Sequence, residues 1–320
     1  MIEPERAAPQ LPHVRRTRML GMLACVTAPA APSIDVVMRE TRALVRELGL
    51  AQVEPNVIAD RSNLVLHLAP HPLVARVAMA TSMVRVGMQW LRREVEISRF
   101  LDGRGAFVTR PSTTIDPGPF DRAGLVISVW DLETIDARAV DPRRAGARLA
   151  GAHRLLASSD APALPEWGGW AEARAVLERA RTSGAWSASE AHRVASAWER
   201  AERIVESARA RTASFQPVHG DAHVGNVLAT SRGPVWTDWE DAFVGPVEWD
   251  LACLRSKAEL FGEERETIDA ITAAYDAPYD AELARELGLV RNLQVIPWLA
   301  VFAERDPSLL PRMRARIEAL

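Results

Sequence analysis

The chain has 320 residues, of which 48% are hydrophobic and 25% are charged, and its formal net charge is −3. This length allows one large or two small domains with a full apolar core. The near-neutral charge gives no reason to expect nucleic-acid binding. Cys25 and Cys253 offer neither a disulfide framework nor metal-ligand spacing, which fits a reducing cytoplasm. No apolar run approaches the length of a transmembrane helix, so we expect no membrane association.

Residues 1–30 are rich in Pro, Ala and Arg and lack periodicity, so we expect a disordered leader. Arg15 to Arg18 precede the apolar run Met19–Cys25, which faintly resembles a lipoprotein signal. That run contains a glycine and lies at the short limit of a signal segment. We therefore favour a leader without a targeting role and a cytoplasmic protein.

Residues 31–130 alternate between helical and strand-like patterns. Ser33 and Gly49 bracket apolar residues at helical spacing, and Pro70–Pro72 and Asp116–Phe120 are typical of turns. The pattern predicts helices at 34–48 and 90–101 and strands near 57–58, 64–68, 73–78, 107–108, 113–115 and 125–130. This is a small N-terminal lobe of about five strands and two helices.

Residues 131–320 are mainly helical. Ser187 and Glu190 form a capping box that predicts the start of a long helix. Apolar spacing predicts helices at 145–158, 187–210, 249–260, 263–275, 280–303 and 307–318. A strand-loop-strand segment, roughly 216–245, interrupts these helices. We expect a larger helical C-terminal lobe built around this segment.

The segment His219-Gly-Asp-Ala-His-Val-Gly-Asn226 carries the strongest functional signal. Phosphoryl transfer from a nucleotide needs a group that accepts or orients the proton of the nucleophile and oxygen ligands for Mg²⁺. Asp221 and Asn226 have the D-x-x-x-x-N spacing of a kinase catalytic loop. Asp238 follows a short apolar strand and can supply a second oxygen, because Mg²⁺ needs few protein ligands beside substrate phosphates.

The run HGDAHVGNVL, followed by TDWEDAFVGPVEWDLA, resembles the aminoglycoside phosphotransferase family, which also contains choline-kinase-like and other small-molecule kinases. The chain has Ala222 and Val224 where the family usually has Leu and Pro, and neither position carries chemistry. The resemblance is strong over 215–253 and holds in outline over 35–320. It implies an α+β, bilobal protein-kinase-like fold with a nucleotide-binding N-lobe and a catalytic loop in the C-lobe.

The resemblance also assigns roles around the loop. It implies that Asp221 faces the substrate hydroxyl as the catalytic base or orienting group, and that Asn226 and Asp238 hold Mg²⁺. His219 and Asp250 are expected to brace the loop. His223 either touches phosphates or braces the loop. Glu240 and Asp241 lie next to Asp238 in sequence and can add contacts around it.

The nucleotide side departs from the kinase pattern. Kinases pair a strand lysine with a helix glutamate to hold the phosphates, whereas the matching strand here carries Arg76. Lys257 is the single lysine among 39 basic residues, so an arginine here fits the chain's composition. Glu94 is the expected partner and Glu96 the alternative. Arginine binds phosphate through a larger, planar fork, which leaves full activity open.

No glycine-rich loop separates the first strands. Ser62 and Asn63 can instead offer donors to phosphate, and the link Ser128–Trp130 is expected to lie against the adenine. The sequence therefore predicts an ATP- (or GTP-) and Mg²⁺-dependent kinase of a small-molecule hydroxyl, with aminoglycoside-like antibiotics, amino sugars and other alcohols all open. A nucleotide-binding pseudokinase or regulatory module and a peptide Ser/Thr kinase are the alternatives. Acids at 254–290 would suit a polycationic acceptor or simply form solvated helix faces. The sequence does not define the oligomeric state.

Overall fold

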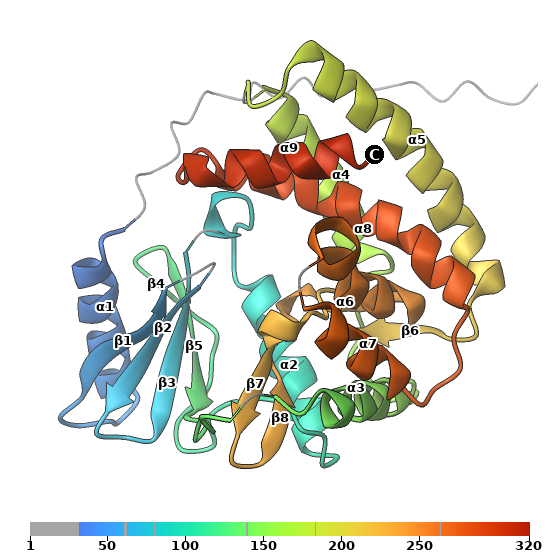
Figure 1. Cartoon of the computed structure of the whole chain (residues 1–320). Helices are drawn as coiled ribbons and strands as arrows, with labels where there is room; N and C mark the ends of the chain where they lie inside the picture. Colours follow the sequence, from blue (N-terminus) through green and yellow to red (C-terminus); the bar gives the residue numbers. More distant parts are fainter. Residues whose placement is uncertain (1–31, 61–62, 80, 139, 183, 263) are drawn as a thin grey trace, which may run out of the picture. The chain divides into compact units, whose positions relative to one another are not determined.

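The computed structural model describes residues 32–320 except 61–62, 80, 139, 183 and 263. The predicted leader at 1–30 lies outside the described residues. Strands and helices are segregated along the chain, as the predicted α+β class requires (Figure 1).

The N-terminal lobe is an antiparallel sheet of five strands in the order β1-β2-β3-β5-β4. The strands are β1 (Glu54–Asp60), β2 (Asn63–Ala69), β3 (Leu73–Ala78), β4 (Phe120–Arg122) and β5 (Leu125–Asp131). Helix α1 (Ile34–Glu47), capped by Ser33, contributes Val37 and Leu44 to the core beside the sheet. Helix α2 (Gln89–Asp102) connects this lobe to the rest of the molecule, with Ile97 and Leu101 buried in the core of the C-terminal lobe.

One part of the strand prediction is wrong. The segments 107–108 and 113–115 do not form strands of the sheet, and the fourth strand is Phe120–Arg122. Val108 and Pro111 make only isolated bridges, to Trp236 and Trp130. Pro111 lies between the two segments, and Pro117 and Pro119 follow the second one. Each proline lacks the N–H that a strand ladder needs.

The C-terminal lobe is built from helices around two short strand pairs (Figure 1). Its helices are α3 (Pro142–Leu156), α4 (Gly168–Thr182), α5 (Ala188–Arg211), α6 (Glu248–Phe261), α7 (Arg265–Ala273), α8 (Ala281–Phe302) and α9 (Leu310–Glu318). The pairs are β6 (Phe215–Val218) with β9 (Phe243–Pro246) and β7 (Val227–Thr230) with β8 (Gly233–Trp236). These pairs carry the loop that contains Asp221 and the turn that contains Asp238.

Helix α4 was not predicted, because small residues mark much of its buried face. Its buried side chains are Trp170, Ala173, Val176, Leu177 and Ala180, so alanines hide the apolar period that identifies a helix. The predicted capping box is confirmed, since the Ser187 side chain accepts from the Glu190 N–H and Glu190 accepts from the Ser187 N–H.

Glycine allows the close packing of α3 on α7, and this contact generates a stability prediction. A Cβ at Gly146 would lie 2.1 Å from the Ile271 carbonyl oxygen. Gly146→Ala must therefore push the two helices apart, which we expect to cost about 1–3 kcal/mol of unfolding free energy. Urea unfolding measures this loss.

Gly151→Ala on the same helix is the matched control. A Cβ there would meet only the end of the Arg154 side chain, at 3.9 Å. We expect no loss, or a gain of up to about 1 kcal/mol from better helix propensity. Equal effects of the two substitutions would contradict the packing argument.

Candidate active site

Asp250 at the start of α6 holds the backbone of the catalytic loop. Its carboxylate is fully buried and accepts hydrogen bonds from the N–H groups of His219, at 2.7 Å, and Gly220, at 2.9 Å. His153 on α3 donates its Nε2–H to the same carboxylate at 2.8 Å, and its Nδ1 accepts from the Tyr275 hydroxyl at 2.7 Å. A buried chain of hydrogen bonds thus fixes the loop just before Asp221.

Gly220 is required by the close approach of two backbone segments. Its φ is +85°, and a Cβ would lie 2.0 Å from the carbonyl oxygen of Asp241. The Gly220 carbonyl accepts from the Trp249 indole at 2.9 Å. The loop therefore passes directly beside the turn that follows Asp238.

His219 and Asn226 join the loop to the end of β8. His219 Nε2 donates to the Thr237 carbonyl at 2.9 Å, and its Nδ1 accepts from the Asp221 N–H at 3.3 Å. The Asn226 amide donates to the Asp221 carbonyl at 3.0 Å, and the Asn226 carbonyl accepts from the Thr237 N–H, also at 3.0 Å. Asp238 follows at once and adopts the left-handed conformation, with φ +69°, which Asp tolerates better than most residues. The structure thus brings the three residues of the sequence motif together.

The guanidinium of Arg76 on β3 lies among carboxylates from three parts of the chain. It forms ion pairs with Glu94 of α2, with Asp238 at 2.5 Å and with Glu240 at 3.4 Å. With its amide oxygen turned toward Arg76, Asn63 also accepts from Nη2 at 2.6 Å. Arg76 therefore connects the sheet, α2 and the turn after β8.

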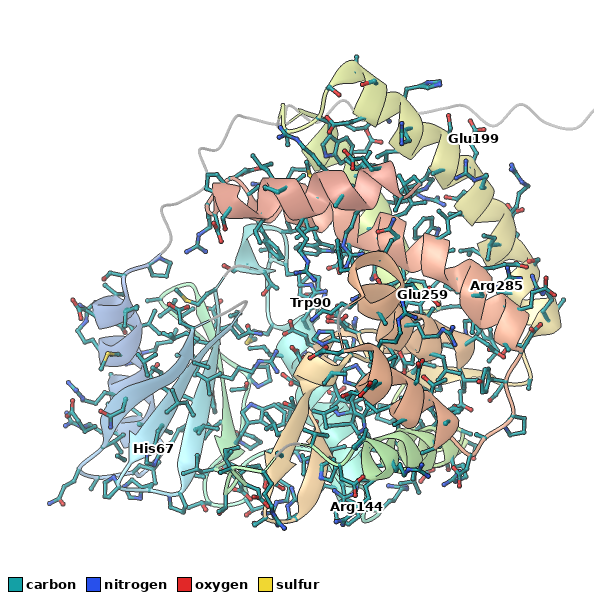
Figure 2. The ribbon with its side chains drawn as sticks, viewed as in Figure 1. His67, Trp90, Arg144, Glu199, Glu259 and Arg285 are labelled. Atoms are coloured by element: carbon teal, nitrogen blue, oxygen red, sulfur yellow. The ribbon has the colours of Figure 1, made fainter. Side chains whose placement is uncertain are left out.

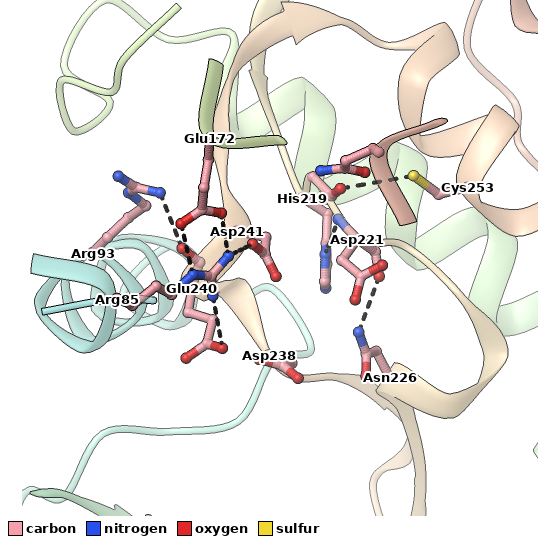
Figure 3. A network of polar contacts seen from close by, with 12 residues as sticks. Arg85, Arg93, Glu172, His219, Asp221, Asn226, Asp238, Glu240, Asp241 and Cys253 are labelled. Carbon is pink, nitrogen blue, oxygen red and sulfur yellow. Dashed lines mark hydrogen bonds and ion pairs between the residues drawn. The ribbon is translucent and has the colours of Figure 1, made fainter. Parts of the chain in front are cut away.

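A second buried arginine, Arg85, lies close by in the segment before α2. It donates to both oxygens of Glu172 on α4, at 2.9 and 2.7 Å, and also pairs with Glu240 and Asp241 (Figure 3). The rings of Trp90 and Trp298 lie 5.6 and 5.2 Å from its guanidinium carbon, and Figure 2 labels Trp90 at the start of α2. These contacts connect the two lobes.

The crowding of carboxyl groups changes their protonation. Burial raises the pKa of Glu94 to about 8 and that of Glu240 to about 7, although the charge of Arg76 acts in the opposite direction. Burial also raises the pKa of Asp241, against the charge of Arg85. At neutral pH some of these carboxyl groups therefore carry a proton, and the cluster has fewer negative charges than carboxyl groups.

Asp221 is held differently. Arg291 of α8 donates to its Oδ1, and His223 Nε2 lies 3.5 Å from its Oδ2. Burial acts to raise the pKa of Asp221, but the charges of Arg291 and His223 outweigh it and hold the pKa well below its usual range. Asp221 is therefore an anion suited to accept a hydrogen bond, and a weak proton acceptor.

A cavity of about 180 Å³ opens beside Asp221 and Asp238. It is lined by Thr81, Arg85, Asp221, Asp238, Glu240, Asp241, Arg291, Gln294, Val295, Trp298 and Phe302. Of the nine acids at 254–290 that suggested a polycationic acceptor, the eight that the structure describes do not line this cavity. The carboxylates of the site come from the catalytic segment itself.

The other residues that were predicted to contact the nucleotide differ in how the structure places them. Ser62 lies outside the described residues. Ser128 and Trp130 are buried on β5, where the Ser128 hydroxyl accepts from the Trp130 indole at 2.9 Å. Their side chains are therefore not exposed for contact with a nucleotide. Glu96 is exposed, so Glu94 is the residue that pairs with Arg76.

Sequence reasoning missed Arg85, Glu172, His153 and Arg291. Each reaches the site from a helix or loop far away in the chain, and no short motif contains it. Arg291 does share a helix face with Gln294, Val295 and Trp298 at i, i+3, i+4 and i+7, but a surface ion-pair face has the same spacing.

A family model described as the phosphotransferase enzyme family matches residues 84–289. The chain belongs to this family, which confirms the prediction of a phosphotransferase. It is a small-molecule kinase by this membership. No curated protein matches the chain significantly.

Several solved structures share the bilobal, protein-kinase-like fold. An aminopropanol kinase associated with a microcompartment is 14% identical, with 89% of this chain and 95% of that chain covered and a TM-score of 0.68. An amicoumacin kinase in complex with AMP-PNP, Ca²⁺ and Ami is 16% identical, with the same coverage and a TM-score of 0.62. Choline kinase LicA from Streptococcus pneumoniae is 14% identical over 89% of this chain and 99% of that chain, with a TM-score of 0.60. The predicted fold class is confirmed.

Two further observations bear on the site and its setting. Within the described part of the chain, no group of three or more His, Cys, Asp or Glu side chains is arranged to hold a metal ion. Among the same residues, no helix has both the length and the apolar character needed to cross a membrane.

The raised pKa of Glu240 generates a pH prediction. An unfolded glutamate titrates near 4.5 and the folded one near 7. Within this window only the folded state keeps the proton, so its contribution to stability falls as the pH rises. Relative to Glu240→Gln, which cannot titrate, the unfolding free energy of the wild type should fall by up to about 1.4 kcal/mol per pH unit.

Urea unfolding of the ligand-free protein between about pH 5 and 7 measures this difference. Glu282→Gln, at a glutamate whose side chain is 66% exposed, is the control and should leave the slope unchanged. A free-energy difference between wild type and Glu240→Gln that stays constant across the window would contradict the raised pKa.

Proposed function

We propose that the protein transfers the γ-phosphoryl group of ATP to a hydroxyl of a small molecule in a Mg²⁺-dependent reaction. One observation carries this proposal: Asp221 and Asp238 line one cavity although 17 positions separate them, and the Asn226 amide donates to the Asp221 carbonyl beside it. In this proposal, Asp221 is the anion that meets the acceptor hydroxyl. Asn226 and Asp238 are the oxygen ligands for the metal that phosphoryl transfer requires.

Asp221 orients the acceptor hydroxyl and takes up its proton as the phosphoryl group is transferred. Its low pKa makes early proton removal unfavourable, which suits a loose transition state in which the nucleophile keeps its proton late. Asp250 and His219 keep the loop in place through the hydrogen bonds described above. The loop is thus rigid before substrate binds, and its ordering costs little during the reaction.

The donor set fits a magnesium ion. Asn226 and Asp238 would hold it through an amide and a carboxylate oxygen, the hard ligands that Mg²⁺ prefers, with phosphate oxygens as the remaining ligands. When bound, the ion neutralises charge on the transferring phosphates. Arg76 pairs with the Asp238 carboxylate at 2.5 Å, and this contact with a cation supports the proposed metal role of Asp238.

The nucleotide phosphates lie against Arg76 in this proposal, and Glu94 holds the arginine in place. Asn63 supports the same guanidinium, and the backbone at Ser128–Trp130 contacts the base. ATP is the proposed donor, with GTP as the alternative. The relatives act on different acceptors, among them amicoumacin, aminopropanol and choline, so an antibiotic, an amino sugar or another alcohol would fit the class.

Asp221→Asn tests the proposal. The substitution keeps the shape of the side chain but removes the anion, so we expect turnover to fall roughly 10²-fold or more, with nucleotide affinity unchanged. Transfer from γ-labelled ATP to a panel of alcohols measures turnover, and calorimetry measures affinity.

Asp276→Asn provides the control, because this side chain is 62% exposed and pairs only with the exposed Arg154 among the described residues. It should behave as wild type. Near-normal turnover of Asp221→Asn would remove Asp221 from the mechanism. Nucleotide binding without transfer to any acceptor would favour a nucleotide-binding module.

A further inference from the structure

Arg291 is a buried cation in the wall of the acceptor cavity. It lies on α8, and only 13% of its side chain is exposed. One nitrogen donates to Asp221, and another donates to the neutral Gln294 amide oxygen at 2.5 Å. Among the described residues, Asp221 is its only carboxylate partner within ion-pair distance.

Arg85, the other arginine that lines this cavity, has its positive charge balanced in a different way. Arg85 pairs with three carboxylates, Glu172, Glu240 and Asp241. None of these is proposed to act on the acceptor hydroxyl. Arg85 therefore keeps these carboxylate partners when substrate binds, whereas Asp221 is the one carboxylate paired with Arg291 among the described residues.

This difference creates competition at Asp221. An acceptor hydroxyl that binds Asp221 weakens the contact with Arg291, and a buried guanidinium without an anionic partner is strongly unfavourable. An acceptor that brings its own anion removes this cost. A carboxylate suits the planar guanidinium fork best, because two parallel hydrogen bonds can form.

We propose that the acceptor is a hydroxy acid, whose carboxylate binds Arg291 while its hydroxyl binds Asp221. Because Arg291 and Asp221 are in direct contact, the two groups of the acceptor lie close together, as in 2- or 3-hydroxy acids. Val295, Trp298 and Phe302 line the same cavity and offer an apolar surface to the rest of the molecule. This inference rests on the proposed function and narrows its acceptor.

The competing explanation uses both oxygens of Asp221. Arg291 could stay on Oδ1 while the hydroxyl binds Oδ2, and the arginine would then only lower the basicity of the carboxylate or contact the phosphoryl group. In that case Arg291 affects every acceptor equally and does not distinguish charged from neutral ones. This difference decides the experiment.

Two series of matched probes test the proposal. The first comprises 3-phenyllactate, its carboxamide and 1-amino-3-phenylpropan-2-ol, which share a hydroxyl and a benzyl group but are anionic, neutral and cationic. The second comprises 3-hydroxy-4-phenylbutanoate with its amide and amine. Calorimetry on protein loaded with Mg·AMP-PNP measures binding, and γ-labelled ATP measures transfer.

The proteins compared are wild type, Arg291→Gln, Arg291→Lys and the control Arg285→Gln. Arg285 lies on the same helix, its side chain is 68% exposed, and Figure 2 labels it. We expect wild type and control to bind an acid at least roughly tenfold more tightly than its amide. Arg291→Gln should abolish this preference, and Arg291→Lys should keep part of it, because it retains the charge without the fork.

Three binding results would overturn the proposal: equal or tighter binding of the amides or amines by wild type, no binding of any acid, or an equal loss for all probes in Arg291→Gln. If Arg291→Gln does not fold, two measurements still test the proposal. Wild type should bind an acid more tightly than its amide, and Arg291→Lys should show a smaller preference for the acid. Transfer to amino alcohols alone would keep the kinase and overturn this inference. A different outcome is a protein that binds acids through Arg291 but transfers phosphate to no acceptor. That result would support the assignment of Arg291 as a carboxylate-binding residue and count against the proposed kinase activity.

Discussion

The site depends on one electrostatic constraint: the buried guanidinium of Arg76 must be neutralised where three chain segments meet. Glu94, Asp238 and Glu240 share this charge, and Arg85 joins the same network through Glu240. Removing one partner from such a buried network leaves an uncompensated charge, which is strongly unfavourable. The sheet, α2 and the turn after β8 are therefore held in one arrangement, and the turn fixes the catalytic loop through Gly220 and Asp241.

The same constraint bears on the arginine at the position where the resemblance to kinases implies a lysine. Arg76 pairs with the Asp238 carboxylate at 2.5 Å. In the proposed function, the nucleotide phosphates would become the anionic partners of Arg76, and Asp238 would be free to hold the metal. The charge of Arg76 would then be balanced in both arrangements, because its planar fork suits carboxylate and phosphate alike. A parallel exchange is proposed at Asp221 and Arg291.

Much of this could be predicted from the sequence, because the catalytic loop is local. Asp221 and Asn226 lie within one short segment, Asp238 follows one hairpin later, and helical periods predicted most helices. The prediction failed where local signals are weak. Prolines turned expected strands at 107–115 into an irregular connection, and alanines concealed α4. Arg85 and Arg291 were missed because they pair with residues far away in the sequence: Asp241 lies 156 positions from Arg85, and Asp221 lies 70 positions from Arg291. Only the folded chain brings these residues together.

We propose that Asp238 exchanges its ion pair with Arg76 for the metal of a bound nucleotide. Calorimetry of ATP binding with Mg²⁺ and with EDTA, in wild type and in Asp238→Ala, measures this exchange. We expect wild type to bind ATP much more tightly with Mg²⁺ than with EDTA, and Asp238→Ala to lose this difference, because Asn226 alone is a neutral, single ligand. The same gain from Mg²⁺ in both proteins would exclude Asp238 as the metal ligand.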